Sequence, residues 1–234
     1  MYNILICDDE QDIVNALKIY LNSPDLNLYE ANTGVQALAV LEREDIHLVL
    51  MDIMMPEMDG ISAMVKLRER SNVPVILLTA KSEDTDKILG LNAGADDYIT
   101  KPFNPVEVTA RVRSQLRRYL LLGSRVEQAA QERYVIGGIE MDDAGKQVQM
   151  DGEPVALTPT EYEILKLLMA NPGRVFSPKE IYRQVWKEEP FGSDNAVAVH
   201  IRHLREKLEI NPAEPRYLKV VWGQGYKMEK GVRS

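Results

Sequence analysis

Polar side chains follow four apolar segments of the sequence, each directly after the segment ends. Residues 3–7 are followed by Asp8 and Asp9, residues 47–51 by Asp52, residues 73–78 by Thr79, and residues 97–100 by Lys101. Because the carboxyl ends of parallel strands meet at one edge of a sheet, where ligands bind, we expect these side chains to lie together. One such residue alone is usually a polar strand terminus, whereas four in succession favour a site.

The predicted cluster combines three carboxylates with one ammonium and one hydroxyl group. Closely packed carboxylates repel each other, so Asp8, Asp9 and Asp52 need positive charge beside them. Lys101 supplies one unit and a divalent cation would supply the rest, and oxygen ligands favour a hard ion such as Mg²⁺. A carboxylate beside Mg²⁺, a lysine and a hydroxyl can accept a phosphoryl group as a mixed anhydride. The residues therefore predict a phosphoryl-accepting site with Mg²⁺ as cofactor.

The first half of the chain must supply the strands and helices that hold this site. The four apolar segments are typical of buried parallel strands, and a weaker strand is expected around residues 28–30. Segments with helix composition alternate with them at residues 12–21, 35–42, 60–70, 83–92 and 107–122. This order predicts an α/β domain with a flavodoxin-like (βα)₅ sheet and right-handed crossovers.

The sequence changes character after Tyr134. Short alternating segments with turn residues, among them Asp151-Gly152, predict a small antiparallel sheet over residues 135–157. Two capping boxes, at residues 158–161 and 177–180, each predict the start of a helix. A third helix from residue 193 or 194 to about 210, and a hairpin over residues 217–228, complete a second domain. We expect a first domain over 1–121, a linker over 122–133 and a second domain over 134–234.

The net charge of −8 and the pI near 5.1 argue against nucleic acid as a partner of the whole chain. Residues 195–234, however, hold eight basic and four acidic side chains, so the C-terminal end permits a nucleic-acid interface. No apolar segment of the sequence approaches the roughly 20 residues that a membrane span needs. Cys7 is the only cysteine, which excludes an internal disulfide and a Cys-rich zinc site. With no visible signal peptide, we expect a cytoplasmic protein without a membrane partner.

The third predicted helix of the second domain has one apolar face and one mixed face. Val197, Ile201, Leu204 and Leu208 recur at helical spacing and predict a core contact. The opposite face carries charged residues, which indicates either a solvated helix or a DNA-reading helix. Arg202 could reach a guanine or a phosphate, Val199 would suit a thymine methyl group, and the hairpin with Lys227 could enter a minor groove. The candidate DNA-binding residues are Asn195, Val199, His200, Arg202, His203, Arg205 and Lys227.

His200 and His203 are three residues apart on this helix. No acidic or cysteine partner is visible near them in the sequence. We therefore expect them not to bind a metal, and we place His200 near a DNA phosphate.

The first half resembles the receiver domain of two-component response regulators. The motifs that carry the resemblance are Asp8-Asp9 and residues 50–60, 78–80, 94–98 and 101–103. The resemblance implies that Asp52 is the phosphoacceptor, that Asp9, Asp52 and the Met54 carbonyl hold Mg²⁺, and that Asp8 acts through water. It also implies that Thr79 and Tyr98 form a switch pair, that a cis proline follows Lys101, and that Met54 shields the phosphoryl group.

The second half resembles the winged-helix effector domain of the OmpR/PhoB family. Residues 157–161, 197–207 and 220–227 carry this resemblance, and residues 117–119 and 200–207 are most similar to VanR-type regulators of glycopeptide resistance. The resemblance implies a transcription regulator that receives its phosphoryl group from a sensor histidine kinase, dimerises, binds double-stranded promoter DNA and contacts RNA polymerase through residues 187–192. It implies no catalysis beyond the chain's own phosphorylation and dephosphorylation.

The family resemblance also implies a symmetric dimer face. Three ion pairs would form across it, namely Lys87 with Glu107, Asp97 with Arg111 and Asp96 with Arg118. Charges of this kind could equally be solvated or paired within one chain.

Two other functions remain open at this point. An aspartate-nucleophile phosphatase would need a second aspartate two residues after Asp52, where this chain has Met54. A regulator that never takes up phosphate would use the receiver only to dimerise.

Since His203 stands where relatives often carry arginine, the base preference of those relatives does not transfer to this chain.

Overall fold

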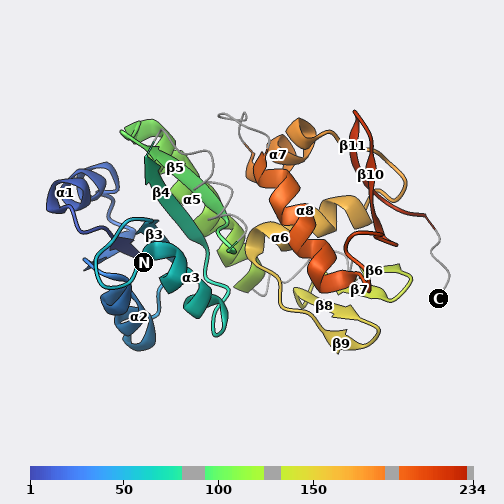
Figure 1. Cartoon of the computed structure of the whole chain (residues 1–234), viewed down its shortest axis with the longest axis horizontal. Coiled ribbons are helices and arrows are strands. Elements are labelled where there is room, and N and C mark those ends of the chain that lie inside the picture. Colours follow the sequence, from blue (N-terminus) through green and yellow to red (C-terminus); the bar gives the residue numbers. More distant parts are fainter. Residues whose placement is uncertain (81–92, 124–132, 188–194, 231–234) are drawn as a thin grey trace. The chain divides into compact units, whose positions relative to one another are not determined.

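The computed structural model of the chain divides into two compact units, Met1–Tyr119 and Leu120–Ser234 (Figure 1). It describes residues 1–80, 93–123, 133–187 and 195–230, without the side chains of residues 120–123 and Asn195. The helix predicted at 83–92, with Lys87, and most of the linker predicted at 122–133 lie outside the described residues. The predicted domain boundaries of 1–121 and 134–234 stay a prediction.

The N-terminal unit is built on a parallel sheet. Its described strands are β1 (Tyr2–Cys7), β2 (Leu26–Ala31), β3 (Leu48–Asp52), β4 (Val75–Ala80) and β5 (Asp97–Lys101). They lie in the order β2-β1-β3-β4-β5, and all neighbours run parallel. The predicted α/β class is confirmed, and the weak segment around residues 28–30 is a full strand of six residues.

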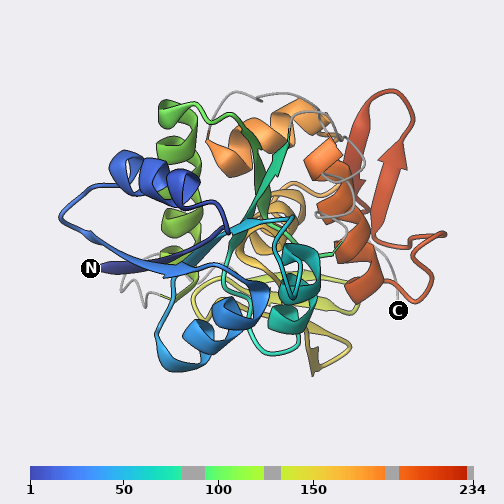
Figure 2. The same ribbon diagram turned by 60° about the vertical axis from the view of Figure 1, so that its left-hand side comes forward.

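Helices cover both faces of this sheet, which explains why its central strands β3 and β4 are almost entirely apolar and buried. They are α1 (Gln11–Tyr20), α2 (Gly34–Arg43), α3 (Gly60–Arg68) and α5 (Pro105–Gly123). Figure 2 shows α1 and α5 against one face and α2 and α3 against the other. Ile6, Leu50 and Leu78 of the strands pack with Leu17 of α1 and Val112 of α5 in one buried cluster. Every side chain of β3 is buried.

The C-terminal unit combines a small sheet, helices and a hairpin. The sheet is antiparallel, with β6 (Arg133–Ile136), β7 (Ile139–Asp142), β8 (Gln147–Met150) and β9 (Glu153–Pro154). The Asp151-Gly152 turn is present, with positive φ at both residues. The final strand follows this turn directly at Glu153 and ends at Pro154, earlier than the segment 155–157 predicted from the sequence, although the Val155 N–H still donates to the Val148 carbonyl oxygen at 2.9 Å.

The helices of this unit begin as the sequence predicts. α6 (Pro159–Met169) and α7 (Pro178–Trp186) each start with a complete capping box, formed by Thr158 with Glu161 and by Ser177 with Glu180. α8 (Asn195–Leu208) ends two residues before the expected position. The Glu209 carboxylate accepts the N–H groups of Tyr217 and Leu218 at 2.8 Å each, which holds the start of the hairpin β10 (Leu218–Val221) and β11 (Gly225–Met228) beside this helix end.

Candidate functional sites

The carboxyl edge of the parallel sheet gathers the predicted cluster. Asp8 follows β1, and Asp52 and Lys101 are the last residues of β3 and β5. The Lys101 Nζ lies 2.8 Å from Asp8 Oδ2 and 2.8 Å from Asp52 Oδ1. Glu10 Oε1 lies farther from the same nitrogen, at 3.7 Å. One ammonium therefore bridges two carboxylates that come from neighbouring strands.

The two carboxylates need this positive charge because they are buried. Asp8 is fully buried and the Asp52 side chain is 8% exposed. Burial raises the pKa of Asp52, while the hydrogen bond and the charge of Lys101 act in the opposite direction. For Lys101 burial alone would lower the pKa, but its hydrogen bonds to Asp52 and Asp8 outweigh burial and raise that pKa. Lys101 is therefore charged at neutral pH.

Backbone N–H groups orient the two carboxylates further. The Met54 N–H donates to Asp52 Oδ2 at 3.0 Å, and the Glu10 N–H donates to Asp8 Oδ1 at 3.0 Å. A Cβ atom on Gly60 would lie 2.0 Å from the Asp52 carbonyl oxygen, so this loop closes on the strand end only with glycine there. Gly60 belongs to the motif at residues 50–60, but the sequence gives no sign of this close approach.

The acidic residues fit a hard divalent cation. One carboxylate oxygen from each of Asp8, Asp9 and Asp52 lies within 4.8 Å of the others, and Asp9 is exposed to solvent. Such oxygens are the ligands that Mg²⁺ prefers. Both oxygens of Asp8 already have partners, in Lys101 and the Glu10 N–H. Both oxygens of Asp52 are engaged in the same way, by Lys101 and the Met54 N–H, so direct ligation by Asp9 and Asp52 with Asp8 acting through water stays a prediction.

Two further predicted site residues lie on β4 and β5, with Thr79 near the carboxyl end of β4 and Tyr98 near the amino end of β5. Thr79 belongs to β4, is 2% exposed, and its hydroxyl donates to the Ala80 carbonyl oxygen at 3.3 Å. Tyr98 of β5 is 8% exposed, and the bond between Lys101 and Pro102 is cis as the resemblance implied. The Met54 side chain is 75% exposed, although its backbone contacts Asp52. The switch and shielding roles of these residues stay predictions.

The residues of the predicted dimer face have partners inside the chain. Arg111 contacts both carboxylate oxygens of Asp97, at 2.8 and 2.9 Å, and Glu107 at 2.9 Å. Asp96 pairs with Arg68 at 2.9 Å, and Arg118 donates to the Ser114 hydroxyl at 2.9 Å. Lys87 lies outside the described residues. Pairing of these charges across a dimer interface stays a prediction.

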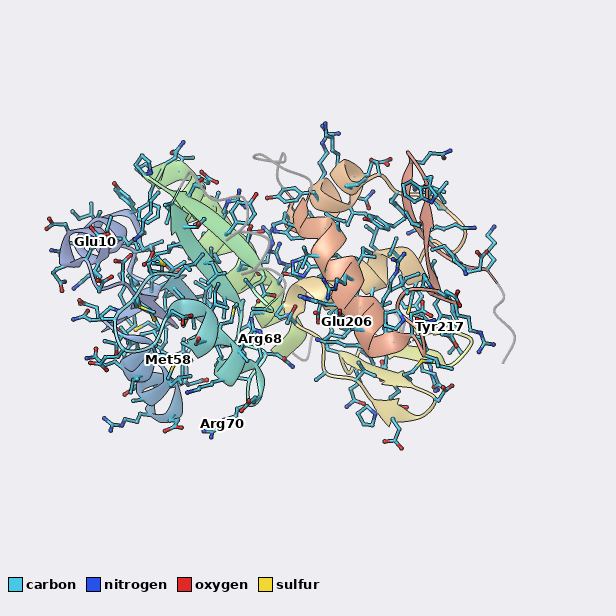
Figure 3. The ribbon with its side chains drawn as sticks, viewed as in Figure 1. Glu10, Met58, Arg68, Arg70, Glu206 and Tyr217 are labelled. Carbon is cyan, nitrogen blue, oxygen red and sulfur yellow. The ribbon has the colours of Figure 1, made fainter. Side chains whose placement is uncertain are left out.

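The DNA-binding candidates divide into exposed and internally bonded side chains. Arg202 is 64% exposed and pairs at 2.8 Å with Glu206, which lies one turn further along α8 and is itself 44% exposed. Figure 3 labels Glu206 on this helix. Lys227 is 26% exposed and lies 3.1 Å from Glu229. Arg205 instead donates to the Leu218 carbonyl oxygen, at 2.7 and 3.0 Å, which joins α8 to β10. The Asn195 side chain is outside the described part of the structure.

The mixed face of α8 is less open than its sequence predicts. Val199, His200 and His203 are buried, with 8%, 1% and 8% exposure. The His200 ring centroid lies 5.8 Å from that of Trp186, and His203 Nδ1 lies 3.6 Å from Glu161 Oε1. The expectation that these histidines lack an acidic partner is therefore wrong. That partner comes from α6, so the sequence of α8 alone gave no signal for it.

Comparison with known proteins places the whole chain in one family. Residues 4–113 match the family model described as a response regulator receiver domain, and residues 152–228 match that described as transcriptional regulatory protein, C terminal. The chain belongs to the OmpR/PhoB family of two-component response regulators, so it is a transcription regulator with a receiver domain and a DNA-binding domain.

Its relatives match over nearly their full length. The regulatory protein VanR of Enterococcus faecium is 40% identical over 228 residues, covering 97% of this chain and 98% of VanR. SrrA of Staphylococcus aureus is also 40% identical, covering 97% of this chain and 95% of SrrA.

Solved structures of similar proteins have the same fold. The response regulator DrrB, described as a Thermotoga maritima OmpR/PhoB homolog, is 31% identical, with a TM-score of 0.51 over 98% of this chain and 99% of DrrB. A RitR mutant shares the fold at 24% identity, with a TM-score of 0.75 over 99% of this chain and 100% of its own. In the described part of the chain, the helices lack the length and apolar character that crossing a bilayer requires.

Replacing Lys101 by methionine removes the ammonium between Asp8 and Asp52. We expect the pKa of Asp52 to rise further, by about one to three units, because nothing then offsets the burial of its charged form. A carboxyl carbon NMR titration of the metal-free protein measures this change. Lys18→Met, which removes a partly exposed pair with Glu30, is the control and leaves Asp52 unchanged. An Asp52 titration that is the same in Lys101→Met would contradict the assigned counter-charge.

Proposed function

We propose that this regulator accepts a phosphoryl group on Asp52 from a sensor histidine kinase, dimerises through its receiver domain, and then binds promoter DNA more tightly. The observation that carries the proposal is the Lys101 ammonium, held 2.8 Å from both Asp8 and Asp52 at the carboxyl edge of the sheet. The ammonium favours the ionised form of this largely buried carboxylate, and it is the ionised form that can act as a nucleophile.

The transfer itself exchanges one bond to phosphorus for another. An Asp52 oxygen attacks phosphorus, and the bond between phosphorus and the donor's leaving atom breaks. Lys101 and the Thr79 hydroxyl would hold the phosphoryl oxygens, and Met54 would restrict the access of water. Mg²⁺, held by Asp9, Asp52 and the Met54 carbonyl oxygen, would neutralise part of the charge on those oxygens. The Tyr98 side chain would follow Thr79 in the resulting switch.

Phosphoryl uptake is measured by intact mass after incubation with Mg²⁺ and a small-molecule phosphodonor. We expect one phosphoryl group on the wild-type chain and none on Asp52→Asn, because the amide has no nucleophilic carboxylate oxygen. Asp12→Asn, at an exposed position of α1, is the matched control and takes up phosphate as the wild type does.

Other outcomes of the same experiment separate the alternatives. Repeated turnover with release of inorganic phosphate in excess of protein would indicate a phosphatase. No uptake from the small donor or from any phosphorylated histidine kinase would indicate a regulator that works without phosphorylation. Uptake that persists in Asp52→Asn would contradict the assigned acceptor.

For DNA binding, we propose that Arg202 and Lys227 contact the duplex, with Asn195, Val199, His200, His203 and Arg205 as further candidates from the sequence. Arg202 has the strongest support, since it is 64% exposed on α8. Arg205 and the two histidines have structural partners and would position α8 rather than contact bases.

Arg202→Ala tests this assignment on duplexes selected from a random pool by the wild-type protein. We expect weaker binding, and a slope of log K against log salt that is smaller by about 0.9 if Arg202 contacts one phosphate. Loss of discrimination at one base pair would instead indicate a base contact. Arg70→Ala removes an exposed charge of the receiver and is the control. Binding that Arg202→Ala leaves unchanged would remove this residue from the interface.

For dimerisation, we propose that Asp97 of one chain exchanges its partner for Arg111 of a second chain in the phosphorylated protein, together with Asp96–Arg118 and Lys87–Glu107. In a two-fold dimer each residue appears twice, so the pairs repeat. Since the same Asp97 and Arg111 are paired within one chain, a double charge swap cannot separate the two arrangements.

Mixing two single variants does separate them. Chains with Asp97→Arg and chains with Arg111→Asp each place like charges at both positions. In a mixed dimer, however, both intermolecular pairs are opposite in charge. We expect sedimentation velocity of the phosphorylated proteins to show dimers in the mixture and few in either variant alone. Circular dichroism verifies that both variants fold, and folded variants that form no mixed dimer would refute the pairing.

The regulated genes are a separate hypothesis. Similarity to VanR favours control of glycopeptide resistance, while SrrA has the same 40% identity to this chain. Contact with RNA polymerase through residues 187–192, most of which lie outside the described residues, and action in the cytoplasm are proposed on the family resemblance alone.

A further inference from the structure

Three side chains with metal-binding atoms meet inside the C-terminal domain, away from the phosphoryl site. Glu161 comes from the first turn of α6, and His200 and His203 come from α8. One ligand atom from each lies within 4.8 Å of the others, and the three residues are 2%, 1% and 8% exposed. Residues three apart on a helix share a face, so both imidazoles can approach the same point.

The Glu161 carboxylate has one oxygen oriented by other groups and one that faces the histidines. Oε2 accepts the Thr158 N–H at 2.9 Å and the Lys207 ammonium at 2.6 Å. Oε1 lies 3.6 Å from His203 Nδ1, which is too long for a good hydrogen bond. Two ligands of one tetrahedral ion, each at about 2.1 Å from it, are about 3.4 Å apart. The observed separation is therefore closer to that of two ligands than to that of a donor and an acceptor.

The surroundings of the three residues also match those of a metal ligand set. A carboxylate that binds a metal is usually oriented by further hydrogen bonds to its other oxygen. Thr158 and Lys207 make such hydrogen bonds to Glu161. The Trp186 ring beside His200 forms an apolar wall. Lys207 competes for the charge of Glu161, but its side chain is 33% exposed and it contacts the other oxygen. Water screens a charge in that position, which limits its repulsion of a cation at Oε1.

We propose that the C-terminal domain binds one Zn²⁺-class ion through Glu161, His200 and His203, with water completing the coordination. Two imidazoles and one carboxylate are the protein ligands of many open zinc sites, and imidazole nitrogen selects such ions over Mg²⁺. The ion would join the N-terminus of α6 to the face of α8. This site is independent of phosphoryl transfer, because it shares no residue with the cluster at Asp52.

The test uses the full-length chain in the Asp52→Asn background, with excess Mg²⁺, so that the acidic cluster of the receiver does not take up the probe. Co²⁺ and Zn²⁺ are the ions added. We expect one Co²⁺ per chain, with the visible absorption of a four-coordinate site, and its displacement by Zn²⁺. His203→Asn should weaken binding at least tenfold and remove this absorption.

The third histidine of the chain provides the matched control. His47→Asn lies in the N-terminal unit and should leave cobalt binding unchanged. Circular dichroism of His203→Asn verifies that this variant folds, and Glu161 is left intact because it also caps α6. Equal binding by the Asp52→Asn parent, its His203→Asn variant and its His47→Asn variant, or no binding at one equivalent by the parent, would overturn the proposal.

Discussion

A single ammonium group between two buried carboxylates organises the N-terminal domain. Asp8 and Asp52 come from adjacent strands, and without Lys101 their charges would repel each other in a poorly solvated position. The strand order β2-β1-β3-β4-β5 leaves β1 and β5 apart, so the long lysine side chain spans the edge of the sheet. The close approach of Gly60 to the Asp52 carbonyl oxygen further restricts the geometry of this edge.

The C-terminal domain relies on a carboxylate in a comparable way. Glu161 Oε2 completes the capping box of α6 and also contacts Lys207, while Oε1 faces His203 of α8. A residue that the sequence marks only as a helix cap thus also fixes the position of a second helix. Because Glu161 is 2% exposed, removing it would leave buried donors without an acceptor.

The sequence predicts those features that depend on local pattern and on general rules of chain topology. The strands, the capping boxes at Thr158 and Ser177 and the meeting of Asp8, Asp52 and Lys101 follow from apolar segments and from the common edge of a parallel sheet. The partners of His203 and Arg111 do not, since helical spacing gives the face of a side chain and not the element that packs on it. Charge complementarity between Asp97 and Arg111 is visible in the sequence, yet it does not distinguish pairing within a chain from pairing between chains.

The contacts at the end of α8 have a mechanical consequence. Arg205 donates to the Leu218 carbonyl oxygen, and Glu209 accepts the N–H groups of Tyr217 and Leu218. Two side chains four residues apart, Arg205 as donor and Glu209 as acceptor, thereby join the end of the helix to the β10–β11 hairpin. These hydrogen bonds hold the helix and the hairpin at one separation. If both contact DNA as we propose, a duplex would have to present its grooves at that separation or deform, so groove width would contribute to recognition together with base identity.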